Sequence, residues 1–162
     1  MIIYYHKLLY VLPLALITGP FIPDLIVVLC SILFLIDTFR LKLFDYYNNN
    51  FFKIFLIFVF FLNISALFSD YPISFKYSLG YIRYGIFTIL LFYVFKNFPK
   101  FIYNLGIVFV FVFILLIIDG FIQYFFGYNI AQIKIEKYGT GLSYVTSFFG
   151  EEKKLGSFLS RL

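Results

Sequence analysis

The sequence is poor in the residues that most often carry chemistry or crosslinks: its 162 residues include one cysteine, one histidine and no tryptophan. Cys30 lies in an apolar run, so the chain can build neither an intramolecular disulfide framework nor a cysteine cluster for a metal. His6 precedes the first apolar stretch and is interpreted as incidental. No phosphate-loop motif, zinc-ligand spacing or serine–histidine arrangement is present, which excludes a soluble-enzyme mechanism for this chain.

Charge is also scarce. Charged residues make up 13% of the chain, apolar residues 63%, and the mean hydropathy is +0.97. Soluble domains are about 25% charged and about 45–50% apolar. The composition therefore indicates an integral membrane protein. The 26 Phe and 15 Tyr favour codons rich in A and T, which indicates an AT-rich bacterial genome and makes lipid-facing packing the first interpretation of any phenylalanine stripe.

The apolar runs predict the membrane spans. A transmembrane helix needs about 20 mostly apolar residues, within a range of about 17–25. The first run is short, and Pro13 and Gly19-Pro20 interrupt it. A signal peptide would fit that run too, but no small-residue cleavage site follows, so we expect a retained helix. The predicted spans are residues 8–22, 23–39, 51–68, 78–95 and 101–118, with a sixth helix beginning in residues 155–162.

These runs also predict the fold class. An apolar helix satisfies its backbone hydrogen bonds internally, whereas the strands of a membrane barrel would alternate in polarity over about 10 residues. The predicted fold is all-α: a polytopic bundle of transmembrane helices that forms a single membrane domain over residues 1–162. Residues 69–77, SDYPISFKY, are predicted to be a surface turn or a short interfacial helix before the fourth span.

Basic residues in the short loops predict the orientation, because such residues accumulate on the cytoplasmic side. One side of the predicted bundle carries Lys7, Arg40, Lys42, Lys53, Lys96 and Lys100, and the short connections on the other carry Asp24, Asp70 and Lys76. We therefore expect a multi-pass protein of the bacterial inner membrane with a cytoplasmic N-terminus. The outer segment, residues 119–154, is then periplasmic.

Arg83 is the first candidate site residue. It lies about five residues inside the predicted outer end of the fourth span, where a lipid-facing charge is costly and usually indicates a partner or a wet cavity. Its guanidinium could bind a phosphate or carboxylate in bidentate fashion. The alternative is that Arg83 snorkels to the outer headgroups.

Asp119 and Gln123 are the next candidates. They stand one helical turn apart where the fifth span is predicted to end, with Gly120 and Gly127 predicted to mark turns. A carboxylate and an amide on one face could hold sugar hydroxyls. The alternative is that these residues only end the helix and meet lipid headgroups.

Glu151 and Glu152 precede the predicted sixth helix. Acidic residues in the first turn oppose the positive end of the helix dipole, so capping suffices to explain at least one of them. Two adjacent acids point in different directions on a helix, so a glycosidase-like carboxylate pair is not supported.

Three stretches together resemble the O-antigen ligase and O-antigen polymerase family. They are DGFIQYFFGYNI at 119–130, SFFGEEKKLGSFLSRL at 147–162, and LFSDYPISFKYSLGYIRYGIFTILLFYVF at 67–95. Their order and topology carry the resemblance, which covers most of the chain. Family members have about ten or more helices and a large outer loop in their later half. On this resemblance, we expect the chain to be the N-terminal part of such a protein.

The resemblance implies a glycosyl transfer at the periplasmic face that uses neither metal nor cofactor. A glycan on a polyprenyl pyrophosphate moves to an acceptor hydroxyl, either of another lipid-linked glycan, as in a polymerase, or of a lipid A core, as in a ligase. The implied partners are therefore membrane lipid, the lipid-linked glycan and its acceptor, with no nucleic acid.

The resemblance also suggests which residues hold the substrate. Such a transfer needs cations for the departing pyrophosphate and a polar group near the acceptor. Arg83 is the first candidate for the pyrophosphate, followed by Lys76, Lys134 and Arg161, and Asp119 and Gln123 are candidates for the glycan. The family's catalytic basic residues lie in the later outer loop. Family members often carry an arginine a few residues before the FFG run, where this chain has Tyr144, so one phosphate contact that the resemblance implies is missing.

Two other classes stay open. A small transporter subunit would also use a helical bundle with an intramembrane arginine, but would usually show more polar residues within its spans than Asn63, Ser65, Arg83 and Asn104. A non-catalytic membrane scaffold needs only the helices.

Because the family's catalytic residues belong to a later loop, we predict that this 162-residue chain alone has no transferase activity. The purified chain would be incubated with a defined lipid-linked glycan and the products separated by length. Any detectable polymer would contradict the prediction.

Overall fold

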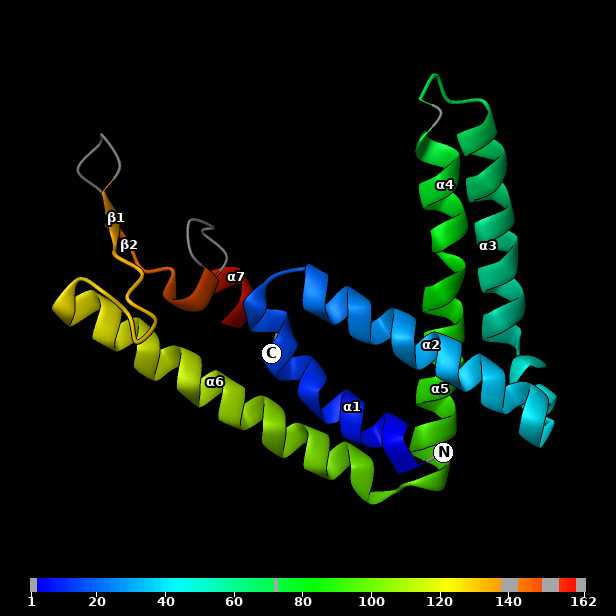
Figure 1. Ribbon diagram of the computed structural model, residues 1–162, viewed down its shortest axis with the longest axis horizontal. Coiled ribbons are helices and arrows are strands. Elements are labelled where there is room, and N and C mark those ends of the chain that lie inside the picture. Colours follow the sequence, from blue (N-terminus) through cyan, green and yellow to red (C-terminus); the bar gives the residue numbers. More distant parts are fainter. Residues whose placement is uncertain (1–2, 72, 138–142, 150–154, 160–162) are drawn as a thin grey trace. The chain divides into compact units, whose positions relative to one another are not determined.

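The computed structural model describes residues 3–71, 73–137, 143–149 and 155–159 (Figure 1). The chain divides into two compact units. The first unit comprises Met1–Leu9 and Asp24–Phe101, and the second comprises Tyr10–Pro23 and Ile102–Leu162.

Helices α2, α3, α4 and α5 form most of the first unit. Helix α2 (Phe21–Leu41) carries Asp24 in its first turn and Arg40 in its last, charges that oppose the two ends of the helix dipole. A 3₁₀ turn, η2 (Leu43–Tyr47), connects α2 to α3 (Asn50–Leu67). The side chain of Asn49 caps α3 by accepting a hydrogen bond from the Phe52 N–H at 2.7 Å.

Helices α4 (Ile73–Gly80) and α5 (Ile82–Asn97) follow one another almost without interruption and lie beside α3 (Figure 1). Together they form an apolar stretch, Ile73–Asn97, that is 25 residues long. The sequence predicts a surface turn or a short helix over residues 69–77, before a span that begins at residue 78, and α4 is a short helix over Ile73–Gly80. Ser78 of α4 donates a hydrogen bond to Asn63 Oδ1 of α3 at 2.9 Å, which holds α4 against α3.

An aromatic cluster around Phe34 fills the interior of the first unit. The ring of Phe34 is fully buried and contacts the rings of Tyr5, Tyr47 and Tyr93, with centroids 5.6–6.3 Å away. The Tyr5 hydroxyl, from α1 (Ile3–Ala15), donates hydrogen bonds to Asp37 and to the Leu33 carbonyl. Burial, together with the bond to Asp37, raises the pKa of Tyr5, so this hydroxyl keeps its proton and remains a donor.

Helix α6 (Lys100–Phe126) dominates the second unit. Buried Val112 and Leu116 of α6 form a core with Ile17 of a short 3₁₀ turn, η1 (Leu16–Thr18). Around this core pack Val108 of α6, Phe148 and Phe149 of η3 (Ser147–Phe149), and Leu155 and Leu159 of α7 (Leu155–Leu159). The described residues 155–159 are helical and fall within the segment 155–162 in which the sequence predicts a helix to begin.

Two details of the second unit differ from the sequence predictions. The helix does not end at Asp119: it continues to Phe126, and Gly120 lies inside it. Gly127 does end it, with φ +80° and its N–H bonded to the Gln123 carbonyl. An antiparallel pair of two-residue strands, β1 (Glu136–Lys137) and β2 (Ser143–Tyr144), also adds a small sheet that an all-α prediction omits.

In the described part of the chain, four helices are long and apolar enough to cross a membrane: Phe21–Leu41, Asn50–Leu67, Ile73–Asn97 and Lys100–Phe126. The first of the five predicted spans is represented only by a shorter apolar helix, Lys7–Thr18. Pro13 is costly inside this helix, and Gly19 follows it with φ +104°, so the helix ends before it reaches the length of the other four. The side of the membrane on which the N-terminus lies stays a prediction.

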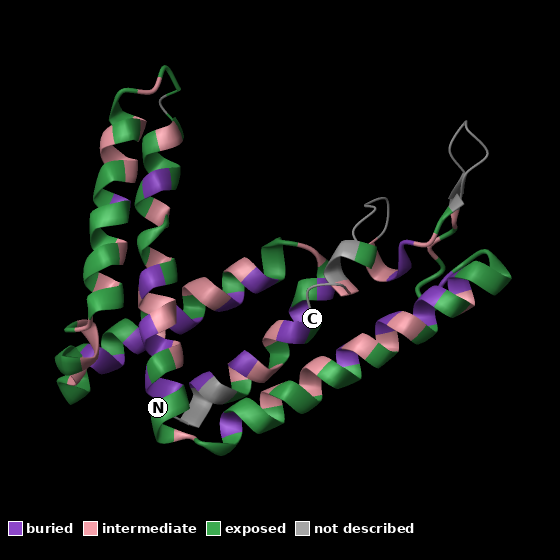
Figure 2. Ribbon diagram, turned by 180° about the vertical axis from the view of Figure 1, so that it is seen from behind, coloured by how far each residue is buried: buried purple, intermediate pink, exposed green. Residues whose placement is uncertain are grey.

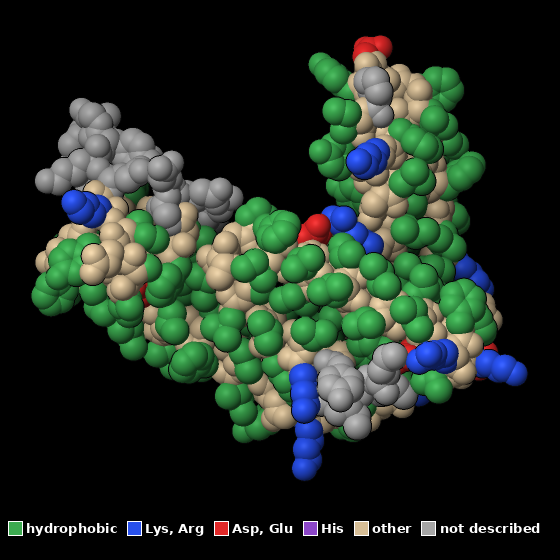
Figure 3. All heavy atoms as spheres, in the orientation of Figure 1, with side chains coloured by type: hydrophobic (Ala, Val, Ile, Leu, Met, Phe, Trp, Pro, Cys, Tyr) green, Lys and Arg blue, Asp and Glu red, His purple; other side chains and the backbone are tan. Residues whose placement is uncertain are grey.

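Exposed residues occur along all four long helices (Figure 2), and many of them are large and apolar. Hydrophobic side chains cover much of the face seen in Figure 3. A soluble protein rarely leaves so much apolar surface uncovered. These helices thus have the outward-facing side chains expected of a multi-pass membrane protein.

Gly85 allows α5 to approach α3. A Cβ atom built at Gly85 would lie 2.3 Å from Cε1 of Phe55 in α3. Small residues permit such close helix approaches in membrane proteins. We predict that Gly85→Ala destabilises the protein by about 1–3 kcal/mol, as overpacking usually does. Thermal unfolding in detergent would measure the effect.

Gly106 provides a matched control in a long apolar helix, because a Cβ there meets nothing within 4 Å. Gly106→Ala should be neutral or stabilise by up to about 1 kcal/mol, since alanine favours helix. Combining Gly85→Ala with Phe55→Ala should cost less than the sum of the two single losses. Strict additivity would contradict the proposed contact.

Candidate functional site

Arg83 pairs with a carboxylate from another helix of the first unit. Its Nη2 lies 2.7 Å from Oδ1 of Asp24, which belongs to the first turn of α2. The two side chains are 34% and 41% exposed, so water still screens this ion pair. The Ser31 hydroxyl donates to the Arg83 carbonyl at 3.0 Å and holds the backbone of α5 against α2.

Tyr84 completes this cluster. Its hydroxyl accepts a hydrogen bond from Arg83 Nη2 at 3.0 Å and lies 3.2 Å from Asp24 Oδ1, to which it donates. The guanidinium carbon also lies 4.9 Å from the centroid of the Tyr84 ring. By contrast, the buried Nε of Arg83 has no hydrogen-bond partner among the described residues. Arg83 therefore keeps unused donor capacity beside its ion pair.

Lys76 and Arg83, both named as candidates from the sequence, line the same hollow. It has a volume of about 430 Å³, and its other lining residues are Tyr77, Gly80, Tyr81 and Tyr84. Positions 76, 80 and 83 share one helical face because they are three or four residues apart. The carboxylate of Asp24 pairs with Arg83, and Lys76 adds a second positive charge to the lining. The hollow thus offers an excess of positive charge, hydroxyl groups and aromatic rings, which suits an anion such as a phosphate.

The sequence did not identify Asp24 as the partner of Arg83. A signal was available, however: Asp24 and Arg83 stand near the predicted outer ends of the second and fourth spans, and an intramembrane charge usually finds an opposite charge at its own depth. Of the other candidates, Lys134 is exposed in the second unit, where it forms an isolated β-bridge with Tyr128. Glu151, Glu152 and Arg161 lie outside the described residues.

Asp119 is fully buried and binds the chain that follows its own helix. Its Oδ1 accepts the Ile130 N–H at 2.9 Å, and its Oδ2 accepts hydrogen bonds from the Asn129 amide at 3.3 Å and from the Ser147 hydroxyl. Asn129 also donates to the Ser147 carbonyl at 2.9 Å. One carboxylate therefore joins α6, the turn after it and η3.

Gln123, also fully buried, repeats this arrangement one turn later. Its Oε1 accepts the N–H groups of Thr146 and Ser147 at 2.8 and 2.6 Å, and its Nε2 donates to the Ile133 carbonyl at 3.3 Å. Asp119 and Gln123 do share one helical face, as their spacing predicts. Both side chains bind the segment that follows α6. Direct contact with a glycan would require that segment to move away from α6.

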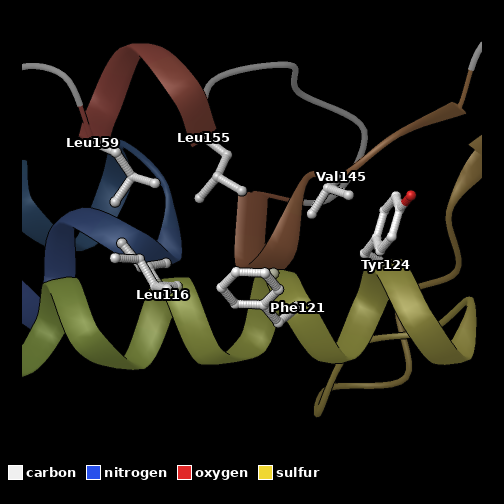
Figure 4. A pocket seen from close by; sticks show the side chains of 8 residues that line it. Leu116, Phe121, Tyr124, Val145, Leu155 and Leu159 are labelled. Atoms are coloured by element: carbon white, nitrogen blue, oxygen red, sulfur yellow. The ribbon is translucent and has the colours of Figure 1, made fainter.

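An apolar hollow of about 450 Å³ lies beside this network (Figure 4). Its lining residues are Leu116, Ile117, Gly120, Phe121 and Tyr124 of α6, with Val145, Leu155 and Leu159 of the returning segment. A Cβ at Gly120 would lie 3.5 Å from Val145 and 3.6 Å from Leu155, so Gly120 marks where this segment packs closely on α6. The lining provides hydrophobic contacts and, apart from the Tyr124 hydroxyl, no group for chemistry.

Among the described residues, no group of three or more His, Cys, Asp or Glu side chains comes together that could hold a metal ion. Comparison with known proteins adds no assignment, because no protein-family model, no curated protein and no solved structure matches the chain. The cationic hollow at Lys76 and Arg83 is therefore the candidate site on chemical grounds alone.

The network at Asp119 generates a prediction about stability. Asp119→Ala leaves the Ile130 N–H, the Asn129 amide and the Ser147 hydroxyl without this acceptor, and an unsatisfied buried donor costs about 1–3 kcal/mol. We expect a loss of about 3 kcal/mol in the free energy of unfolding, and faster tryptic cleavage after Lys134 as the segment leaves α6.

Asp70→Ala serves as the control, because Asp70 is an exposed acid. Asp119→Asn keeps one acceptor oxygen and should fall between the wild type and Asp119→Ala. Equal unfolding temperatures and cleavage rates for the two alanine variants would show that the network does not hold the segment.

Proposed function

We propose that the chain belongs to a membrane glycosyl transferase that polymerises or ligates a polyprenyl-pyrophosphate-linked glycan at the periplasmic face of the bacterial inner membrane. The sequence resemblance over residues 67–95, 119–130 and 147–162 suggests the reaction. The observation that carries the proposal furthest is the shared hollow of Lys76 and Arg83, because it joins two cations that this reaction would need.

In this proposal the two cations act on the departing pyrophosphate. Negative charge develops on that group as the glycosidic bond breaks, and fixed cations at the site of developing charge lower the barrier. Arg83 has a planar fork of donors that matches two phosphate oxygens, whereas Lys76 acts as a mobile point charge. The ion pair with Asp24 orients the guanidinium before the substrate arrives.

The second unit has a supporting role in the proposal. Two of the stretches that carry the resemblance, residues 119–130 and 147–162, meet through Asp119, Asn129 and Ser147. A chain segment held by buried hydrogen bonds can present a fixed surface to a substrate, whereas a free loop would first have to be ordered. Asp119 and Gln123 would accordingly position this segment.

The proposal predicts a preference for pyrophosphate in the binding of lipids. In nanodiscs, the chain should bind a polyprenyl pyrophosphate more tightly than the neutral polyprenol. Arg83→Ala should weaken that binding about 10- to 100-fold, the equivalent of the roughly 1.5–3 kcal/mol of a charged hydrogen bond. Arg83→Lys should recover part of the loss, because it restores charge without the fork. Isothermal titration or a fluorescent lipid analogue would measure the affinities.

Lys53→Ala and Lys100→Ala are matched controls, since both lysines are exposed and lie at the predicted inner ends of their helices. Neither change should alter the affinity. Equal binding of polyprenol and polyprenyl pyrophosphate would overturn the proposed role, as would an equal loss in the lysine controls.

A further inference from the structure

A second hollow lies between α3 and α4, directly beside the cationic one. It has a volume of about 370 Å³ and is lined by Leu62, Ser65, Ala66, Ser69, Ser74, Tyr77, Ser78 and Tyr81. Half of these residues are serines. The close packing of α3 on α4 brings them together, although they come from two helices and the loop between them. We call this the serine hollow, and the one at Lys76 and Arg83 the cationic hollow.

Tyr77 and Tyr81 line both hollows. Their side chains are 71% and 44% exposed, and the Tyr81 ring also contacts that of Tyr84, with centroids 5.7 Å apart. The two rings therefore form a common wall. A ligand whose phosphate lies beside Arg83 and whose next group crosses this wall would enter the serine hollow.

The serine hollow has the chemistry of a sugar site. Serine hydroxyls both donate and accept hydrogen bonds, as sugar hydroxyls do. The hydroxyl oxygens of Ser69 and Ser74 already lie 3.3 Å apart, and the buried Ser78 donates to Asn63, so three of these hydroxyls are held in place, and those of Ser69 and Ser74 keep acceptor capacity. A tyrosine ring offers an apolar face to the C–H face of a sugar and a hydroxyl at its edge. Each volume lies within the range of small-ligand pockets, about 300–1,000 Å³.

We propose that the serine hollow binds the sugar residue next to the pyrophosphate, with Tyr77 and Tyr81 packing against that sugar while Lys76 and Arg83 hold the phosphates. This inference rests on the proposed function, because it adds a sugar subsite to the pyrophosphate site. It also specifies which part of the chain would recognise the sugar: the α3–α4 hairpin of the first unit.

An anionic phospholipid headgroup has related chemistry, because phosphatidylglycerol also carries hydroxyls next to a phosphate. The experiment therefore uses the full chain in phosphatidylcholine nanodiscs and three probes: inorganic pyrophosphate, a soluble glycosyl pyrophosphate, and phosphatidylglycerol mixed into the disc. We expect the glycosyl pyrophosphate to bind about tenfold more tightly than inorganic pyrophosphate, the scale of one good ring contact. Phosphatidylglycerol should not displace it.

Variants separate the two subsites. Tyr77→Ala and Tyr81→Ala should each lower the ratio of the two affinities, glycosyl pyrophosphate over inorganic pyrophosphate, from about tenfold to less than about twofold, because the sugar loses its ring contact. Tyr77→Phe and Tyr81→Phe should retain the preference, because the ring remains. Tyr103→Ala is the matched control, since Tyr103 is 73% exposed on α6. It should leave both affinities unchanged.

The outcomes distinguish this inference from the proposed function. Binding of inorganic pyrophosphate with no preference for the glycosyl probe would overturn the sugar subsite and leave the pyrophosphate site standing. Failure of both soluble probes to bind would overturn both. Displacement by phosphatidylglycerol, with equal affinity for the two soluble probes, would assign the hollows to a lipid headgroup and refute the sugar assignment.

Discussion

A polar side chain surrounded by apolar helices must find its partner within the protein, and this constraint organises both units. Hydrocarbon offers no hydrogen bonds, so an unpaired polar group there costs several kcal/mol. In the first unit, Tyr5 is paired with Asp37, Ser78 with Asn63, and Arg83 with Asp24. In the second, Asp119 and Gln123 serve as acceptors for the segment that returns to α6. These polar contacts therefore add to apolar packing in deciding which surfaces meet.

The same constraint singles out Arg83. The buried donors and acceptors of the Asp119 network bind one another, whereas Arg83 is a third exposed and leaves its buried Nε without a partner among the described residues. It also shares its hollow with a second cation, Lys76. A satisfied network stabilises a fold, and unused donor capacity beside an accessible hollow suits a ligand. The first unit is therefore the one suited to a substrate, and the second is suited to holding its own returning segment in place.

The sequence predictions succeed where run length decides the structure and fail where packing does. Four predicted spans correspond to long helices, and Gly127 ends α6 as its position suggested. The predicted end at Asp119 is wrong because that carboxylate, polar in the sequence, is buried by chain that folds back over it. Residues 73–77 are mixed in polarity and left a surface turn or a short helix open; α3 provides a neighbour, and they form the short helix α4.

By itself, the sequence determined the class of the protein and the approximate ends of its helices, because uninterrupted apolar runs can satisfy their backbone only as helices in a membrane. It also identified Arg83, Lys76, Asp119 and Gln123 as the polar residues that require an explanation. Only the tertiary structure decided what each one contacts. Two results depend on how helices distant in sequence pack: the pairing of Arg83 with Asp24, and the position of Tyr77 and Tyr81 between two hollows. Local sequence patterns do not specify which distant helices pack together.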